Sequence, residues 1–368
     1  MEMKPSRRTF NAMLLAAGTA PFGIGDARAQ SWDEIVAAAH KEGELSVHGG
    51  PGRAYTESFA ENFRKAYPGI KINYTGGPSS AAIPRIMRER ENGIFAWDVF
   101  VGGAPSSYST LKAAGAFIPL APALTDAIKN DKSWLGGFEE GWLDKEKKFS
   151  YAFDFTTEGV MFVNWDHVSR DALRHVKDLL KPEFADKIAW ADPRTLGEGI
   201  FASQVFYENF GIEFLQELFA RQKIAYTATR RQTSEWLVRG RYPIGISAGP
   251  DEIAFFRQEG LGKNIEMFSA GLTKEIGGAG FGCVQLMERA PHPNAARLYV
   301  NWLLGQKAQA DYALAAKRNS RRTDTQPGSP DGVARKSDAY INAQSEAQSE
   351  VRFKVTALAK EKIAAAAR

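Results

Sequence analysis

The sequence is poor in the residues that build disulfides, metal sites and membrane spans. Its single cysteine, Cys283, excludes an internal disulfide, and its position in an apolar run predicts a buried structural thiol. The five histidines are scattered, and no Cys-x-x-Cys or His-Glu-x-x-His spacing occurs. No stretch after residue 29 is apolar over the roughly 20 residues that a membrane-spanning helix needs. These absences argue against a disulfide-stapled domain, a metalloprotease and an integral membrane protein.

Excess charge of one sign is also lacking, with 47 Lys and Arg residues against 43 Asp and Glu residues. So small a net charge predicts no nucleic-acid partner and no attraction to a membrane surface. Apolar residues make up 44% of the 368 residues, which is typical of a globular protein. A chain of this length can form two domains of ordinary size.

Residues 1–29 have the pattern of an export signal, with a basic start, a weakly apolar middle and a small-x-small site at Ala27-Arg28-Ala29. Within it, Ser6-Arg7-Arg8-Thr9-Phe10 resembles the twin-arginine export motif. Export by the general route is the alternative. We expect cleavage near Ala29, release of the mature protein into the bacterial periplasm and no lipid anchor, because no cysteine follows the cleavage site.

Three stretches near the start of the mature chain share one pattern: residues 44–53, 70–80 and 97–107. Each begins with a short run rich in β-formers, continues with Gly-Gly and then Pro with small polar residues, and leads into a helical pattern. A strand, a glycine turn and a helix in regular repetition are typical of a parallel α/β sheet.

The loops of this repeat predict a ligand site. Glycine allows positive φ and close approach of a ligand, and a helix N-terminus directs unpaired N–H groups towards an anion. Ordinary turns between strand and helix are the alternative for any single loop. The candidate ligand-binding residues in these loops are Gly49, Gly50, Arg53, Ser79, Ser80, Gly103 and Ala104.

A second α/β region follows an irregular stretch at 118–148. Residues 149–164 read as two strands interrupted at 156–159, which suits a crossing between two lobes. Further strands are predicted at 187–191, 224–227 and 242–249, and the strand at 281–287 is expected to return to the first lobe. A helical, Ala-rich tail begins near Ser337.

The order of these pieces resembles the type II periplasmic solute-binding proteins of ABC importers, in particular the ferric-iron-binding group. The sequences that carry the resemblance are Ala37-Ala-Ala-His-Lys-Glu-Gly43, Phe63-Arg-Lys-Ala-Tyr-Pro-Gly-Ile70, Trp97-Asp-Val-Phe100, Trp190-Ala-Asp-Pro-Arg194 and Ala290-Pro-His-Pro-Asn-Ala-Ala-Arg297 ahead of Trp302.

The resemblance implies an α/β fold of two lobes, each with a mixed or parallel sheet flanked by helices, and a ligand cleft between them. Lobe 1 is expected at 30–155 with 276–318, and lobe 2 at 156–275 with 319–368. Two or three segments would form the hinge. The implied partners are a small-molecule solute and an inner-membrane ABC permease, and the implied state is a monomer without a cofactor.

One departure from the ferric members bears on the solute. They carry a tyrosine pair after the strand that corresponds to Ile244–Ser247, where this chain has Gly249-Pro250-Asp251. The nearest aromatic residues, Phe255 and Phe256, have no ligating atom. The sequence therefore favours a cleft without metal, although a ferric-binding protein with other ligands, or a metal held by His48 and Asp251, stays an alternative.

Without a metal, arginines, hydroxyls and glycine backbone remain to hold the solute. Arginine matches the geometry of carboxylate and phosphate groups, so we expect a small organic anion: a carboxylate, phosphonate or phosphate ester. For each arginine a solvated surface charge is the alternative, and for the residues at 156–158 a purely mechanical hinge. An exported enzyme is the rival from another class. The candidates outside the first lobe are Thr156, Arg194, Thr195, Arg230, Ser247, Ala248 and Asp251.

Overall fold

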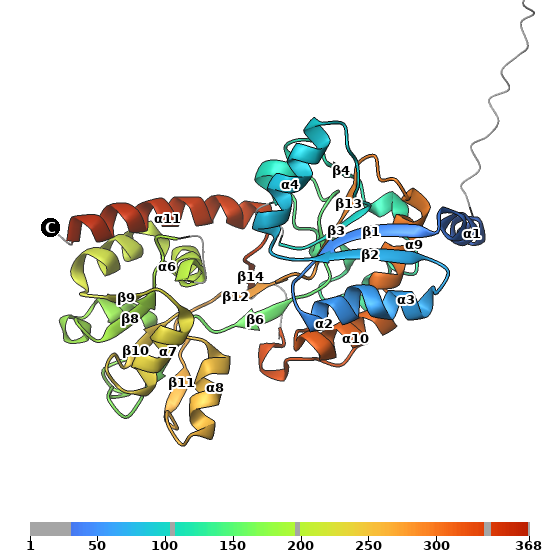
Figure 1. Cartoon of the computed structure of the whole chain (residues 1–368). Helices are drawn as coiled ribbons and strands as arrows, with labels where there is room; N and C mark the ends of the chain where they lie inside the picture. The colour runs from blue at the N-terminus through green and yellow to red at the C-terminus, as the bar shows by residue number, and fades with distance from the viewer. Residues whose placement is uncertain (1–30, 104–106, 196–198, 335–339, 367–368) are drawn as a thin grey trace, which may run out of the picture.

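The computed structural model describes residues 31–103, 107–195, 199–334 and 340–366, which form two lobes joined by a small sheet (Figure 1). The predicted export signal at 1–29, its cleavage site and the candidate residue Ala104 lie outside the described residues.

The first helix shows how local sequence sets local structure. Helix α1 (Trp32–Glu42) begins at a capping box in which Ser31 and Glu34 bond to each other's backbone N–H groups. It ends at Gly43, whose φ of 69° is the left-handed conformation that glycine adopts without strain. The chain then turns directly into the first strand of lobe 1.

Lobe 1 is built on a six-stranded sheet with the order β2-β1-β3-β13-β4, in which β5 also pairs with β13. Strand β1 is parallel to both β2 and β3, as the repeated strand–glycine–helix pattern predicts. Strand β13 returns from late in the chain and runs antiparallel to β3, which confirms the expected return of residues 281–287. The strands are β1 (Glu44–Gly49), β2 (Lys71–Gly76), β3 (Val99–Val101), β4 (Phe117–Ile118), β5 (Tyr151–Ala152) and β13 (Cys283–Met287).

Helices cover this sheet, and the buried core between them includes Val47 of β1 together with the helical residues Phe59 and Tyr299. Cys283 is fully buried in β13, and burial raises the pKa of its thiol, so it has the structural role that the sequence predicts. The α-helices of lobe 1 after α1 are α2 (Arg53–Thr56), α3 (Asn62–Ala66), α4 (Ser79–Glu91), α9 (Pro293–Leu303) and α10 (Gln306–Ala316).

Lobe 2 has a five-stranded sheet with the order β11-β7-β10-β8-β9, in which β10 is parallel to β8 and antiparallel to β7. Its core surrounds Trp190, which packs against Phe206 and Phe219. The strands are β7 (Met161–Asn164), β8 (Ile188–Ala191), β9 (Ala225–Thr227), β10 (Ile244–Ile246) and β11 (Ile265–Met267). The helices are α6 (Gly199–Arg221), α7 (Arg230–Val238), α8 (Pro250–Gln258) and α11 (Glu346–Ala366).

A three-stranded sheet lies between the lobes and forms the hinge. Its strands are β6 (Thr156–Glu158), β12 (Glu275–Gly278) and β14 (Tyr340–Asn342), with β12 in the middle. The expected interruption at 156–159 is wrong in this respect, because 156–158 is itself a strand, paired with β12. The chain thus crosses between the lobes along three short strands.

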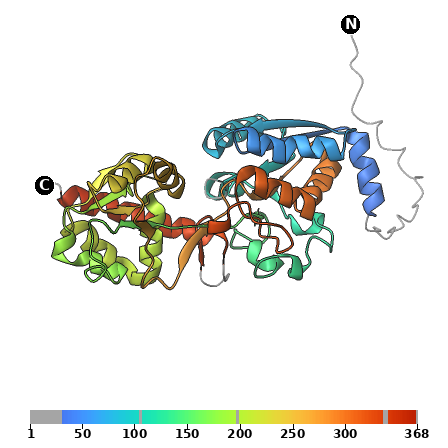
Figure 2. The ribbon, with the colours of Figure 1, turned by 90° about the horizontal axis from the view of Figure 1, so that it is seen from below.

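The boundary expected at residue 319 also needs correction. The Arg321 N–H donates to the Phe153 carbonyl at 2.7 Å, and the Leu135 N–H donates to the Arg321 carbonyl at 2.8 Å. These bonds hold the segment after α10 on lobe 1. Only the end of the chain reaches lobe 2, where α11 packs along α6 (Figures 1 and 2). Among the described residues, no helix has the length and apolarity that crossing a membrane demands.

Candidate functional site

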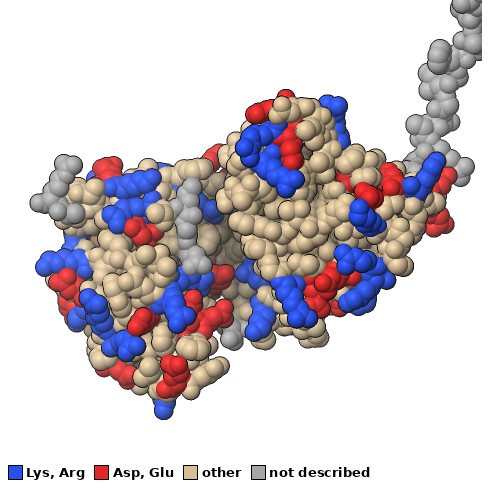
Figure 3. All heavy atoms as spheres, in the orientation of Figure 1, with Lys and Arg blue, Asp and Glu red and all other residues tan. Residues whose placement is uncertain are grey.

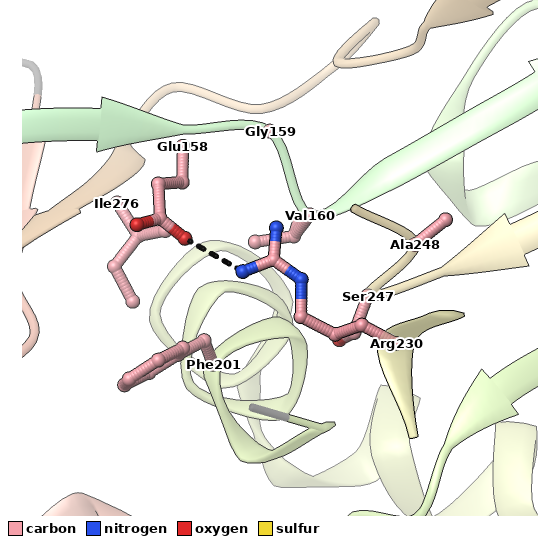
Figure 4. Close-up of a pocket in the computed structure, with 8 residues that line it drawn as sticks. All are labelled: Glu158, Gly159, Val160, Phe201, Arg230, Ser247, Ala248 and Ile276. Atoms are coloured by element: carbon pink, nitrogen blue, oxygen red, sulfur yellow. Dashed lines mark ion pairs between the residues drawn. The ribbon is translucent and has the colours of Figure 1, made fainter. Parts of the chain in front are cut away.

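Two neighbouring cavities lie where the hinge strands meet lobe 2. The arginine cavity, of about 20 Å³, is lined by Glu158, Gly159, Val160, Phe201, Arg230, Ser247, Ala248 and Ile276 (Figure 4). The hinge cavity, of about 100 Å³, is lined by Glu158, Phe201, Ile276, Gly277, Gly278, Gly280, Arg318, Ala343 and Gln344. Because Glu158, Phe201 and Ile276 belong to both, the cavities are adjacent.

A chain of charged residues runs through these cavities from one lobe to the other. The Glu158 carboxylate lies 3.6 Å from Arg230 Nη1 and 3.5 Å from Arg318 Nη1. Arg230 begins α7 in lobe 2 and extends towards Glu158, as Figure 4 shows. Arg318 follows α10 in lobe 1, and its Nε donates to Asp154 Oδ2 at 2.8 Å. The two arginines and the two carboxylates balance in formal charge.

Asp154 anchors this chain in the interior of lobe 1. Its carboxylate is fully buried and accepts hydrogen bonds from the Tyr312 hydroxyl at 2.6 Å and from Thr156 Oγ1 at 2.9 Å. Burial raises the pKa of Asp154, whereas the Arg318 guanidinium lowers it. The Thr156 hydroxyl, a candidate ligand group, also accepts from the Asn319 N–H, so its hydrogen bonds here hold the hinge strand on lobe 1.

Ser247 contributes a polar group with no partner. It directly follows β10, has φ of 59°, and donates its backbone N–H to the Val160 carbonyl at 2.7 Å. The residue is only 7% exposed, and its hydroxyl has no hydrogen-bond partner among the described residues. A buried hydroxyl without a partner is costly, so a bound group that bonds to it recovers free energy.

Ser247 also lies in a spacing that the sequence interpretation missed. Residues 245–249 read Gly-Ile-Ser-Ala-Gly, the Gly-x-Ser-x-Gly pattern of hydrolases, at a turn from β10 to α8. A nucleophilic serine needs a base within hydrogen-bond reach. Among the described residues that line the cavity there is no histidine, and the Ser247 hydroxyl bonds to no base. The geometry therefore fits a ligand donor and not an activated nucleophile.

The structure brings Arg230, Ser247 and Ala248 together but places Arg194 elsewhere. The Arg194 guanidinium binds the Asp192 carboxylate through Nε at 2.9 Å and Nη2 at 2.6 Å, and it lies over the Tyr226 ring. It lines a separate cavity of about 640 Å³ that also contains Ile363, near the C-terminal end of α11. The neighbouring Thr195 is exposed, and its hydroxyl donates to the Asp192 carbonyl.

The glycine loops of lobe 1 have a packing role that the sequence did not reveal. A Cβ on Gly49 would lie 2.5 Å from the Tyr74 ring, and one on Gly50 would lie within 3 Å of Tyr55 and Phe281. Aromatic rings, not a solute, occupy the room that these two glycines leave. Ser79 Oγ accepts from the Gly103 N–H at 3.1 Å, which ties two predicted loops together. The remaining candidates here, Arg53 and Ser80, are exposed.

The structure does not support the metal pair that His48 and Asp251 would form. His48 is buried in the sheet of lobe 1 against Phe100, whereas Asp251 is exposed on the first turn of α8 in lobe 2. Within the described ranges, no group of three or more His, Cys, Asp and Glu side chains could hold a metal ion.

His48 instead gives the fold a pH dependence. Burial lowers its pKa to about 4, whereas an exposed histidine in the unfolded chain titrates near 6.5. The unfolded chain therefore binds more protons between these values, and stability falls as the pH drops through this window. Between pH 7 and 4.5 we expect His48 to account for a loss of about 2–3 kcal/mol. Urea unfolding of the wild type and of His48→Leu at pH 7 and at pH 4.5 measures this loss of stability.

The control for this prediction is His40→Gln, because His40 is exposed on α1. On acidification, the free energy of unfolding should fall as much in His40→Gln as in the wild type. It should fall less in His48→Leu. Equal losses in all three proteins would show that His48 does not titrate as its burial implies.

Arg318, Phe201 and Ile276 are the site residues that the sequence did not single out. Arg318 directly follows Lys317, and nothing in the local sequence shows that Arg318 faces the hinge whereas Lys317 is exposed. On the face seen in Figure 3, charges of both signs are interspersed and a notch separates the two lobes. On this face, surface charge thus does not mark the candidate site.

Comparisons with known proteins agree with this architecture. Residues 46–310 match a family model described as bacterial extracellular solute-binding protein. Trichodesmium IdiA (FutA), solved with iron and citrate, is 16% identical with a TM-score of 0.65, over 87% of this chain and 99% of its own. Ferric iron-binding protein A of Mannheimia haemolytica, in an open conformation, is 18% identical with a TM-score of 0.65, over 87% and 99%.

A third similar structure is AfuA of Actinobacillus pleuropneumoniae with exogenous fructose-6-phosphate bound, 18% identical with a TM-score of 0.56, over 87% of this chain and 98% of its own. At such identities the likeness shows the fold, and it confirms the predicted α/β binding-protein fold and the suspected resemblance. A comparison with curated protein sequences found no match.

Proposed function

Because the chain belongs to the bacterial extracellular solute-binding protein family, we propose that it captures a small organic solute with an acidic group in the arginine cavity, for delivery to an inner-membrane ABC permease. The acidic group is a carboxylate, phosphonate or phosphate ester. Export through the twin-arginine pattern and cleavage near Ala29 would bring the mature chain to the periplasm as a monomer.

One observation carries this proposal: the Arg230 guanidinium and the unpartnered Ser247 hydroxyl line the same cavity. An arginine supplies forked N–H donors, and a serine hydroxyl adds one more. Two similar structures hold molecules with acidic groups, namely citrate in IdiA (FutA) and fructose-6-phosphate in AfuA. Both are compatible with a protein of this fold that binds a solute with an acidic group.

The hinge supplies the mechanism of capture. Arg318 comes from lobe 1 and Arg230 from lobe 2, and both contact Glu158 on the strand that connects the lobes. A solute beside Glu158 can contact both lobes at once when they close. Such contacts stabilise the closed state to the extent that the solute binds it better than the open state.

The first test is a thermal-shift screen of mature protein, residues 30–368, with carboxylates, phosphonates, sugar phosphates and ferric citrate. A solute at a hundred times its Kd should stabilise the fold by about 2.7 kcal/mol. Titration calorimetry with that solute then tests the site. Arg230→Ala should weaken binding about 10- to 150-fold, as expected for a charged hydrogen bond, and Ser247→Ala about 2- to 10-fold.

The matched control is Arg194→Ala, which removes an arginine from lobe 2 but from the separate cavity. Its affinity should equal that of the wild type. If Arg194→Ala weakens binding and Arg230→Ala does not, the solute does not occupy the arginine cavity. A shift with ferric iron alone would favour the ferric alternative.

A further inference from the structure

We propose that the solute is a small zwitterion with an apolar arm: its acidic group at Arg230 and Ser247, its ammonium group at Glu158 and its arm in the hinge cavity. Apolar amino acids belong to this chemical class. The inference rests on the proposed function, since it takes the arginine cavity as the place where the acidic group binds.

The charge balance of the site is the first argument. Arg318 is committed to the buried Asp154, and Arg230 faces Glu158, so these four described residues together carry no excess positive charge. A plain anion placed at Arg230 meets the like charge of Glu158. A zwitterion brings its own cation to that carboxylate and leaves every charge with a partner.

The position of Glu158 is the second argument. Its distances to Arg230 and Arg318, 3.6 and 3.5 Å, are ion-pair contacts longer than a usual hydrogen bond. Its side chain is 36% exposed. A carboxylate has about four acceptor positions, so Glu158 can accept from an ammonium group without giving up either arginine.

The hinge cavity is the third argument. Phe201, Ile276 and Ala343 give it an apolar lining, and its volume of about 100 Å³ admits several water molecules or a short carbon chain. It shares Phe201, Ile276 and Glu158 with the arginine cavity. A molecule whose acidic group lies at Arg230 can therefore pass Glu158 and place its apolar end between the hinge strands.

Sets of matched probes test the ammonium group. Each set has one apolar arm (that of valine, leucine or phenylalanine) on an α-amino acid, on the corresponding α-hydroxy acid and on the corresponding amine. With one of the arms we expect the amino acid to bind at least tenfold more tightly than the hydroxy acid, and the amine to bind more weakly still. Glu158→Gln should reduce the amino acid's advantage at least fivefold.

Outcomes of this experiment separate the two proposals. Suppose that the hydroxy acids or phosphonates bind as tightly as the amino acids and that Arg230→Ala weakens their binding. The proposal of a zwitterionic solute is then wrong, whereas the proposed site for an acidic group stands. If no acid of any kind depends on Arg230, the proposed function fails as well. An advantage that survives in Glu158→Gln would assign the ammonium group to another residue and overturn the inference.

A second variant tests the apolar arm. A Cβ on Gly278 would have only the Ala343 Cβ in reach, at 4.0 Å, so Gly278→Val reduces the hinge cavity without a clash at its first carbon. We expect it to weaken binding of the preferred amino acid at least tenfold more than binding of glycine, which has no arm. Gly77→Val is the control, because its Cβ would have no neighbour within 4 Å and it lines neither cavity. If Gly278→Val leaves the ratio of the two affinities, for the preferred amino acid and for glycine, unchanged, the apolar arm does not bind in the hinge cavity.

Discussion

Replacing Arg318 with alanine should lower the free energy of unfolding by about 3–5 kcal/mol, because the buried Asp154 carboxylate loses its charged partner. Asp154 has no exposed surface, and Arg318 Nε and Nη2 both donate to it. Arg318 also donates to the Gly278 carbonyl at the end of β12. The substitution therefore weakens lobe 1 and its connection to the hinge together.

Urea unfolding of three variants measures this effect against a matched pair. Arg194 and Asp192 form a similar two-bonded pair, but their side chains are 39% and 24% exposed. Arg194→Ala should thus cost at most about 1 kcal/mol. Adding Asp154→Asn to Arg318→Ala should restore part of the loss, since an amide is cheaper to bury than an unpaired charge. If Arg318→Ala and Arg194→Ala lower the free energy of unfolding equally, burial does not set the strength of these ion pairs.

Much of the fold follows from local sequence, but the hinge strands β12 and β14 do not. The capped helix α1 and the parallel strand β1 have the pattern that their structures require. Strand β12 contains two glycines and β14 has only three residues, so neither has a strong strand pattern of its own. They become strands because β6 offers a partner to β12, and β12 in turn to β14. The sequence of neither segment predicts this pairing, because the partner strand lies far away in the chain.

Residues that line the candidate cavities could be predicted from the sequence where they directly follow a strand. They could not be predicted where a segment distant in the sequence packs against the cavity. Arg230 and Ser247 were predicted because strands β9 and β10 end just before them, and both line the arginine cavity. Arg194 was predicted beside them, but it lines a separate cavity and binds Asp192, a carboxylate only two residues earlier in the sequence. Arg318 reaches Asp154 across 164 positions of the chain, and only the folded structure shows that contact.

The same lesson applies to the glycine loops of lobe 1. A double glycine after a strand is compatible with a bound ligand and with a packed ring, because both need a backbone without a side chain. Tyr74 lies on the neighbouring strand β2, and its hydroxyl donates to the Gly50 carbonyl at 2.6 Å. The choice between ligand and ring thus depended on which side chain the next strand brings, which the loop itself does not encode.

Replacing Trp190 with alanine should divide thermal unfolding into two transitions. Trp190 is fully buried in β8, and its Nε1 donates to the Gly199 carbonyl at 3.0 Å. Its loss should cost about 3–5 kcal/mol, which for a lobe of this size lowers Tm by about 6–20 °C. The described buried residues form separate main cores in lobe 1 and lobe 2, so this loss should act on lobe 2 alone.

Scanning calorimetry of Trp190→Ala and Trp134→Ala tests this division. Trp134 is the matching residue of lobe 1, 2% exposed, with its Nε1 bonded to the Ile128 carbonyl at 2.6 Å. The two variants should lower the Tm of different transitions, since only the hinge sheet and a few neighbouring contacts couple the cores. Saturating solute should bring the transitions together again, because it binds only when both lobes are folded. A single transition lowered equally by both substitutions would show that the hinge transmits stability between the lobes, in which case closure could not be a motion of two independently stable bodies.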